Sequence, residues 1–243
     1  MEFREEAERA AAAFGMPLAA PQAEQLAAYY ELLTDWNRKM NLTAITEPRA
    51  VAVKHVADSL SAFDAAIFTE GVRVIDVGTG AGFPGLVLKI YFPSMDLVLL
   101  DALQKRVKFL EAVVAALGLS GVSCLHGRAE ETARQKKWRE RFDLAIARAV
   151  ARLDVLAEYT LPFVRVGGAA LALKGARYAE EMAEAEQAAK ILGGGKPTAK
   201  PIKLPGLDDG RAVVRIDKER PTPAAYPRKA GTPEKKPLGQ PGK

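Results

Sequence analysis

The sequence predicts an α/β protein built on a mostly parallel sheet of seven strands with an antiparallel hairpin at one edge. Short apolar, β-branched runs alternate with helix-like segments from residue 72 onward, which is typical of parallel sheets. A glycine-rich loop, 78–85, follows the first of these runs. The last two runs, about 200–204 and 211–217, are joined by a short turn-rich segment, as antiparallel strands are.

A small helical segment, 1–70, is expected before the sheet. Residues 2–14 and 22–40 have helical character, because apolar residues recur at steps of three and four. In the second helix these residues are Leu26, Tyr29, Leu33, Trp36 and Met40, and we expect them to pack in the core. A further helical stretch, 47–60, is punctuated by Pro48.

The sheet domain is predicted to span 71–217. Its expected elements in chain order are a strand at 72–77, a helix at 84–92, a strand at 96–101, a helix at 104–117, a strand at 122–126, a helix near 129–138, a strand at 142–147, a helix at 152–164, a strand at 169–174, a helix at 176–192 and the final hairpin. Pro84 suits the first turn of a helix.

The loop after the first strand is expected to hold a ligand. Gly78, Gly80 and Gly82 permit positive φ and close backbone approach, although such loops also serve nicotinamide sites, flavin sites and structural turns. Two acidic residues narrow the choice among these kinds of loop. Asp76 lies inside the strand, where a dinucleotide fold normally has an apolar residue. Asp101 ends the next strand, 19 residues after Gly82, which is about the spacing at which a carboxylate meets ribose hydroxyls.

Composition limits the class of protein. A chain of 243 residues with 49% hydrophobic content suffices for one α/β domain with a small addition. No window approaches the roughly 18 apolar residues of a membrane span, so we expect a cytoplasmic protein without membrane contact. Cys124 is the single cysteine, and His55 and His126 are the only histidines. Disulfides and a Cys/His zinc cluster are therefore excluded, no metal is expected, and Cys124 is expected to pack.

The basic excess is confined to the C-terminal segment. The net charge is +5, and residues 218–243 carry seven basic residues, two acidic residues and six prolines. We expect this segment to be extended rather than helical. A flexible basic strand suits a phosphate backbone. A solvated terminus without a partner is the alternative.

Several motifs along the chain carry a family resemblance. They are Ile75 to Leu86 (IDVGTGAGFPGL), Leu100 to Arg106, Gly127 to Glu130, Ala147 to Val150 and Tyr226 to Pro233. From Asn41 to Leu238 the chain resembles the RsmG (GidB) family of small-subunit rRNA guanine-N7 methyltransferases. The resemblance implies a Rossmann-like class I fold dependent on S-adenosylmethionine. It also implies a monomer that acts on 16S rRNA or the small ribosomal subunit, at N7 of guanosine 527 in the 530 loop.

The resemblance also implies a cofactor-binding set. Its members are Asp76, Gly78, Gly80, Gly82, Phe83, Asp101, Ala102, Leu103, Ala129, Glu130 and Arg148. The glycine loop would surround the methionine end, where free N–H groups favour a carboxylate. Asp101 would accept hydrogen bonds from the ribose hydroxyls, Ala102 and Leu103 would lie against the adenine, and Ala129 and Glu130 would lie near its edge. For Glu130 taken alone, a helix cap or turn role stays open.

Cations are expected at the same edge of the sheet. Arg148 ends the fourth strand, Lys174 ends the fifth, and Arg128 follows the third. The three side chains should therefore face the same opening at the ligand edge of the sheet. The resemblance places these three and Asn41 in the catalytic or RNA-contact set. Ion pairing of the cations with Asp76, Asp101 or Asp143 stays open, as does the choice between catalysis and capping for His55 and Asp58.

Two absent motifs bear on the methyl acceptor. No Asp/Asn-Pro-Pro-Tyr follows the fourth strand, and no Pro-Cys nucleophile is present, so the acceptor should supply its own lone pair. Guanine N7 fits, because it carries no proton. A methyltransferase acting on another RNA, a protein or a small molecule is an alternative. A catalytically silent RNA-binding module is another, and a nicotinamide dehydrogenase is the least favoured.

Overall fold

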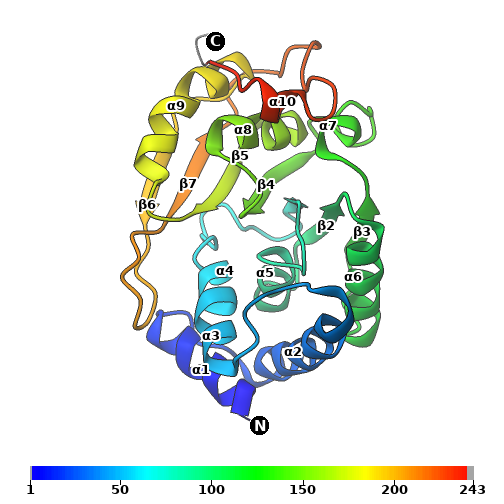
Figure 1. Cartoon of the computed structure of the whole chain (residues 1–243), viewed down its shortest axis with the longest axis vertical. Coiled ribbons are helices and arrows are strands. Elements are labelled where there is room, and N and C mark those ends of the chain that lie inside the picture. The colour runs from blue at the N-terminus through cyan, green and yellow to red at the C-terminus, as the bar shows by residue number, and fades with distance from the viewer. Residues whose placement is uncertain (1, 240–243) are drawn as a thin grey trace.

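The computed structural model describes residues 2–239 and shows one seven-stranded sheet between two layers of helices (Figure 1). The strands are β1 (Arg73–Val77), β2 (Asp96–Asp101), β3 (Val122–His126), β4 (Phe142–Arg148), β5 (Val164–Lys174), β6 (Thr198–Pro201) and β7 (Ala212–Asp217). Their order is β3-β2-β1-β4-β5-β7-β6. The strands β1 to β5 run parallel, and β7 is antiparallel to both β5 and β6. The predicted fold class is confirmed.

Helices cover both faces of the sheet because its strands are apolar on both sides. Along β1, Val74 packs into one core, whereas Ile75 and Val77 pack into the other, as side chains of a strand alternate. The first face carries α5 (Gly85–Tyr91) and α6 (Gln104–Ala116). The opposite face carries α7 (Ala129–Thr132), α8 (Leu153–Thr160), the 3₁₀ helix η2 (Leu161–Phe163) and α9 (Tyr178–Ile191) (Figure 1).

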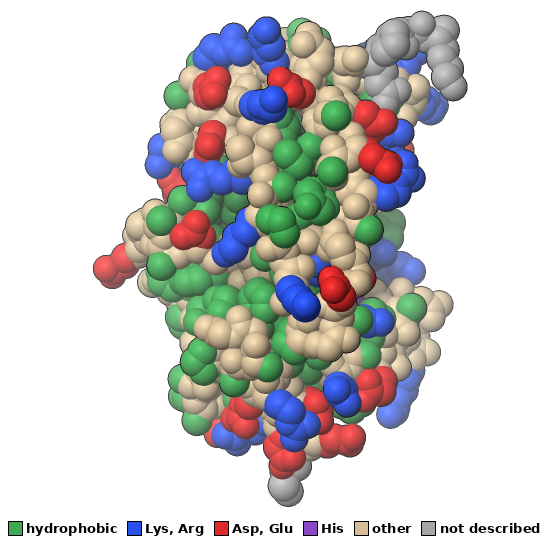
Figure 2. Space-filling model, turned by 90° about the vertical axis from the view of Figure 1, so that its left-hand side faces the viewer, with side chains coloured by type: hydrophobic (Ala, Val, Ile, Leu, Met, Phe, Trp, Pro, Cys, Tyr) green, Lys and Arg blue, Asp and Glu red, His purple; other side chains and the backbone are tan. Residues whose placement is uncertain are grey.

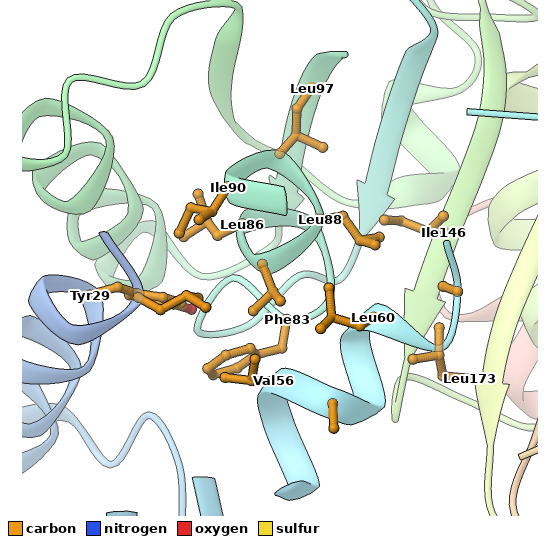
Figure 3. Packing of buried hydrophobic residues seen from close by; sticks show 14 of the residues in the cluster. Tyr29, Val56, Leu60, Phe83, Leu86, Leu88, Ile90, Leu97, Ile146 and Leu173 are labelled. Carbon is orange, nitrogen blue, oxygen red and sulfur yellow. The ribbon is translucent and has the colours of Figure 1, made fainter. Parts of the chain in front are cut away.

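The N-terminal helices belong to the first of these layers. They are α1 (Glu2–Ala13), α2 (Ala20–Met40), α3 (Pro48–Val51), the π-helix η1 (Ala52–Ala57) and α4 (Asp58–Leu60). Leu26, Tyr29 and Leu33 are buried as predicted, and Trp36 is half-buried against Phe109 of α6. Figure 3 shows how side chains of these helices meet those of α5 and the strands.

Several predicted elements differ from the structure. The strand predicted at 169–174 begins at Val164, and the helix predicted at 152–164 ends at Thr160 before the 3₁₀ helix η2. The helix predicted at 129–138 ends at Thr132, and the chain continues in tighter turns that bring Trp138 onto Phe142. The stretch predicted at 47–60 is helical from Pro48 to Leu60 but passes through the π-helix η1. The edge strand β6 lies at 198–201 rather than 200–204.

The prediction of a flexible, extended C-terminal segment is wrong for residues 218–239. Lys218 is 2% exposed, and its ammonium donates to the Leu161 carbonyl and to Thr222 Oγ1, both at 2.6 Å. The segment ends in a short helix, α10 (Thr232–Lys235), beside α8 (Figure 1). Buried ion pairs and Leu238 in the core hold the proline-rich chain in place. The rest of the predicted segment, 240–243, lies outside the described residues.

Within residues 2–239, no helix is long and apolar enough to cross a membrane. The same part of the chain contains no group of three or more His, Cys, Asp or Glu side chains that could hold a metal ion. Cys124 is half-buried against the core, as predicted, and burial raises the pKa of its thiol to about 11.

Replacing Lys218 by Met should lower the free energy of unfolding by about 3 kcal/mol, because the change leaves the Leu161 carbonyl and the Glu140 carboxylate without their buried cation. Urea denaturation measures this. Lys229→Met is the matched control, since Lys229 is exposed in the same segment. Equal stability of the two variants would contradict the packed position of the segment.

Candidate active site

The glycine loop between β1 and α5 leaves open space at one position. Gly80 has φ +63, and a Cβ atom built on it would meet nothing within 4 Å. At Gly78 and Gly82, by contrast, a Cβ atom would collide with Val150 and Leu86. Two of the glycines are therefore required by packing inside the protein. The open side of Gly80 is where a ligand can approach the backbone.

Asp101 fixes the backbone beside this opening. Its Oδ2 accepts the Gly80 N–H at 2.9 Å, and its Oδ1 accepts the Leu103 N–H at 2.8 Å. Each carboxylate oxygen can accept a second hydrogen bond, so Asp101 can both shape the loop and receive hydroxyl groups. Ala102 is exposed beside it, and Leu103 is 44% exposed, which is unusual for a large apolar side chain in this structure.

Asp76 ties the end of β1 to the start of α5. Its Oδ2 accepts the Thr79 hydroxyl at 2.7 Å and the Gly85 N–H at 2.8 Å, and the side chain is fully buried. Burial raises the pKa of this carboxyl to about 6. Its Oδ1 has no hydrogen-bond partner among the described residues. A buried polar atom left unpaired in this way is suited to a donor supplied by a ligand.

The N-terminal helices support the loop from outside the sheet. The Tyr29 hydroxyl on α2 donates to the Ala81 carbonyl in the loop. Phe83 lies in the same layer, with its ring centroid 5.3 Å from Tyr29 and 4.5 Å from His55 (Figure 3). Phe83 is 6% exposed, so it shapes the cradle from beneath.

Arg148 is held by the π-helix of the N-terminal segment. One guanidinium nitrogen, Nη1, donates to the Lys54 carbonyl and to Asp58 Oδ2, both at 2.9 Å. The other nitrogen, Nη2, lies 3.2 Å from His55 Nδ1. The guanidinium carbon also lies 5.1 Å from the centre of the Phe83 ring. Four groups thus fix one cation at the end of β4.

His55 must be neutral to accept from Arg148. Burial is the main cause that lowers the pKa of His55 to about 4, and the charge of Arg148 adds to it. The His55 Nε2 lies 3.0 Å from Thr43 Oγ1. The His55 Nδ1 lies 3.2 Å from Arg148 Nη2 and also 3.0 Å from the Lys54 carbonyl, so the ring is held at both nitrogens.

A cavity of about 490 Å³ opens beside these residues. Its basic lining residues are Arg148, Lys174, Arg177 and Arg211, and its acidic ones are Asp58 and Glu181. Arg211 Nη1 donates to Asp58 Oδ1 at 2.6 Å, and Lys174 Nζ pairs with Glu181 Oε2 at the same distance. Four cations and two carboxylates line the cavity, and Arg211 and Arg177 also pair with Asp209 and Glu180 beside it.

Arg128 does not share this cavity. It pairs instead with Glu130, whose Oε1 lies 3.1 Å from Arg128 Nη2 and also accepts the Gly231 N–H at 2.8 Å. The prediction of three cations at one mouth is therefore wrong for Arg128, because the turn after β3 directs its side chain toward the C-terminal segment. Arg148 and Lys174 are brought together as predicted. Their acidic partners are Asp58 and Glu181, and not the three carboxylates considered from the sequence.

Asn41 lies at the edge of this site. It is the exposed C-cap of α2 with φ 49, two residues before Thr43, which contacts His55. Ala129 is half-buried and begins α7. Two residues of the site were missed from the sequence. Arg211 follows an acidic turn that looked like an ordinary hairpin, and Tyr29 matched the core pattern of α2.

Comparison with known proteins identifies the family. A family model described as GidB, rRNA small subunit methyltransferase G, matches residues 22–204. The chain belongs to this family. It is 51% identical to the ribosomal RNA small subunit methyltransferase G of an Exiguobacterium species over 92% of this chain and 94% of the relative. It is 45% identical to the protein of that name from Alkaliphilus oremlandii over 98% of this chain and all of the relative.

Solved structures agree on the fold. The chain is similar to a predicted O-methyltransferase of Agrobacterium tumefaciens, with a TM-score of 0.52 and 21% identity over 68% of this chain and 80% of that one. It is also similar to the S-adenosylmethionine-dependent methyltransferase SibL, with a TM-score of 0.55 and 15% identity over 83% of this chain and 70% of that one. The predicted family, methyltransferase fold and S-adenosylmethionine cofactor are confirmed.

The residues present fit this cofactor. A nucleoside needs acceptors for its hydroxyl groups and an apolar surface for its base, and Asp101 and exposed Leu103 lie side by side. The open side of Gly80 leaves room for close approach. The unpaired Asp76 Oδ1 adds an acceptor beneath the loop. A cationic ligand would also favour the charged form of Asp76, whose pKa burial raises.

Asp101→Asn should weaken S-adenosylmethionine binding by about 10- to 100-fold, since one oxygen and the negative charge are lost where hydroxyl groups and the Gly80 N–H converge. Calorimetry measures the Kd. Asp96→Asn is the matched control, because Asp96 is exposed at the other end of the same strand. Equal affinities of the two variants would contradict the assignment of Asp101 to the cofactor.

The stability of the protein should depend on His55 between pH 4 and 6.5. Its folded-state pKa, about 4, lies below its ordinary value of 6.5, so the unfolded state binds more protons in this window. The contribution is therefore full above pH 6.5 and is lost as the pH falls toward 4. It amounts to about 3 kcal/mol.

Urea denaturation of the wild type and His55→Gln at several pH values isolates the contribution of His55 to the free energy of unfolding. The stability difference between the two should grow from pH 4 to 6.5. Asp76, whose folded pKa is raised, contributes in the opposite direction but equally in both proteins. Parallel profiles would show that His55 is not buried in neutral form.

Proposed function

We propose that this chain transfers a methyl group from S-adenosylmethionine to N7 of a guanine in small-subunit rRNA, at guanosine 527 in the 530 loop of 16S rRNA. Membership of the small-subunit rRNA methyltransferase G family supports an RNA substrate. The acceptor atom is argued from the cavity beside the cradle. That argument depends on one observation: both carboxylates that line it are ion-paired with cations.

Both carboxylates of the cavity lining are ion-paired. Asp58 Oδ1 accepts from Arg211, and its Oδ2 accepts from Arg148. Glu181 Oε2 accepts from Lys174 and from the Leu153 N–H. His55 Nδ1 lies 3.2 Å from Arg148 Nη2. Taking a proton from an acceptor would compete with these contacts.

Guanine N7 requires no such base. It carries a lone pair and no proton, so the transfer needs orientation and exclusion of water rather than deprotonation. When bound, the cofactor supplies an electrophilic methyl group. An exocyclic amine would lose a proton on methylation, and both carboxylates that line the cavity are already ion-paired with cations.

The cations have a complementary task. Arginine commonly recognises the O6 and N7 edge of guanine, and lysine binds phosphate as a point charge. We assign Arg148 to the guanine edge, because it lies next to the glycine loop and its position is fixed by four contacts. Lys174 and Arg211 would hold the RNA backbone. A base must be unstacked to enter such a cavity, which favours a loop target.

Asn41 and part of the C-terminal segment extend this surface. Asn41 is exposed at the end of α2, and the exposed lysines of the C-terminal segment are Lys229, Lys235 and Lys236. Two of the basic residues of that segment are unavailable to RNA, because Lys218 and Arg228 are ion-paired with Glu140 and Glu158 inside the protein. On the face that carries β6 and α9, Figure 2 shows basic and acidic side chains intermixed at both ends and hydrophobic ones between them. That face is not a continuous basic patch.

Arg128, Ala129 and Glu130 we assign to the adenosine end of the cofactor. They follow β3, whose end neighbours Asp101 in the sheet, and the Gly127 N–H donates to the Asp101 carbonyl at 3.0 Å. The carboxylate of Glu130 already accepts hydrogen bonds from Arg128 and from the Gly231 N–H. Its contribution is therefore to fix the loop, and the backbone of Ala129 would face the ligand.

Incubating small-subunit RNA with labelled S-adenosylmethionine should place the label on one guanosine. N7 methylation leaves a fixed positive charge on the purine, so borohydride and aniline should cleave the product at that nucleotide. Arg148→Ala should lower the rate at saturating cofactor by about 100-fold or more, since an orienting cation acts on the transition state.

Arg165→Ala is the matched control, because Arg165 is exposed near the other end of β5 and pairs only with Asp143 and its own strand. Label on a base that resists this cleavage would refute N7 and leave the fold and cofactor intact. A raised cofactor Kd with an unchanged maximal rate in Arg148→Ala would assign Arg148 to cofactor binding.

A further inference from the structure

We infer that the C-terminal segment 226–238 is part of the cofactor-binding site: it holds the 128–130 loop in the position that receives the adenosine, so that docking of the segment and cofactor binding are linked. This inference rests on the role proposed above for the 128–130 loop. It assigns to the segment a positioning function in addition to any RNA contact.

The first contact joins the segment to the loop directly. Glu130 Oε1 accepts the Gly231 N–H at 2.8 Å and lies 3.1 Å from Arg128 Nη2. Glu130 is 2% exposed. Losing one of its hydrogen-bond partners would therefore cost stability, because water cannot reach the carboxylate to replace that partner. A backbone donor of the segment and a side chain of the loop therefore meet at one buried oxygen, and neither can shift without disturbing the other.

The second contact fixes the segment just before Gly231. Glu158 of α8 is fully buried and receives the Arg228 N–H at 2.6 Å, Nη2 at 2.6 Å and Nε at 3.0 Å. A carboxylate that binds a guanidinium through two nitrogens sets both distance and orientation. Only two residues lie between Arg228 and the Gly231 donor, so the ion pair determines where that donor lies.

The third contact extends the segment to the end of β4. Glu234 and Pro237 line a cavity of about 390 Å³ together with Val150, Ala151 and Arg152. Val150 packs against Gly78 of the glycine loop. The segment therefore borders the ends of two strands, β3 and β4, that flank the cradle on the sheet edge.

Between these contacts lies Tyr159, which is 5% exposed. Burial raises the pKa of its phenol above the ordinary value, and the charges of Glu130 and Glu234 raise it further. The loop carboxylate and a segment carboxylate thus lie near the same buried side chain. The phenol of Tyr159 therefore stays neutral.

Linkage is reciprocal if the inference holds. A ligand that binds the ordered loop must stabilise the docked segment, and release of the segment must weaken the ligand by the same factor. A purely structural segment would behave differently, because its release would lower stability without changing the Kd of the folded protein.

The test uses the full chain. Hydrogen exchange of peptides covering 226–238 should slow by about tenfold with saturating S-adenosylmethionine. Arg228→Met should speed this exchange without ligand and raise the cofactor Kd by about tenfold in calorimetry. Arg228→Lys should restore part of the affinity. Arg220→Met is the matched control, because Arg220 lies in the same C-terminal tail but donates to the Lys190 carbonyl of α9.

The variant Ala129→Leu tests the assignment of the 128–130 loop to the cofactor separately from the linkage to the C-terminal segment. If this variant weakens the cofactor while Arg228→Met frees the segment and leaves the Kd unchanged, the linkage is overturned and the loop assignment stands. If neither variant changes the Kd, both are overturned. If Arg228→Met fails to fold, the exchange measurement on the wild type decides, since absence of protection at 226–238 would overturn the inference.

Discussion

The ion pairs of Asp58 join three parts of the chain that are distant in sequence. Asp58 comes from the N-terminal helices, Arg148 ends β4, and Arg211 directly precedes β7. Asp58 is 6% exposed, and removing one partner of a buried pair leaves an uncompensated charge. The position of each arginine therefore depends on the other two groups. The cavity forms only when the N-terminal helices are docked on the sheet, so these helices are part of the site.

The same contacts set the charge balance of the cavity. Its neighbouring cations would repel each other and lose their orientation unless carboxylates lay between them. Asp58 and Glu181 supply those carboxylates, and each is ion-paired with arginine or lysine. Under the function proposed above, a carboxylate committed to an ion pair is a poor base, which favours an acceptor atom that carries no proton.

Most of the sheet and its ligand edge could be predicted from the sequence. Apolar runs of five to seven residues gave the strand positions, and the rule that parallel strands end at one edge placed Arg148 and Lys174 together. The position of Arg128 could not be derived in this way, because the direction of a side chain after a strand depends on the turn that follows. The π-helix was also hidden, since its apolar pattern hardly differs from that of an α-helix.

The C-terminal segment shows why composition alone misled the prediction. Prolines and basic residues indicate a flexible, extended segment only when the basic side chains stay in water. Here Lys218 and Arg228 are instead paired with Glu140 and Glu158 inside the protein. These partners lie 78 and 70 residues earlier in the chain, beyond the reach of any local pattern. Tyr29 is the converse case. Its spacing marked it as a core residue, which it is, yet its hydroxyl binds the glycine loop. A residue that packs with one end can position a ligand loop with the other, so a core pattern does not by itself exclude a role in the site.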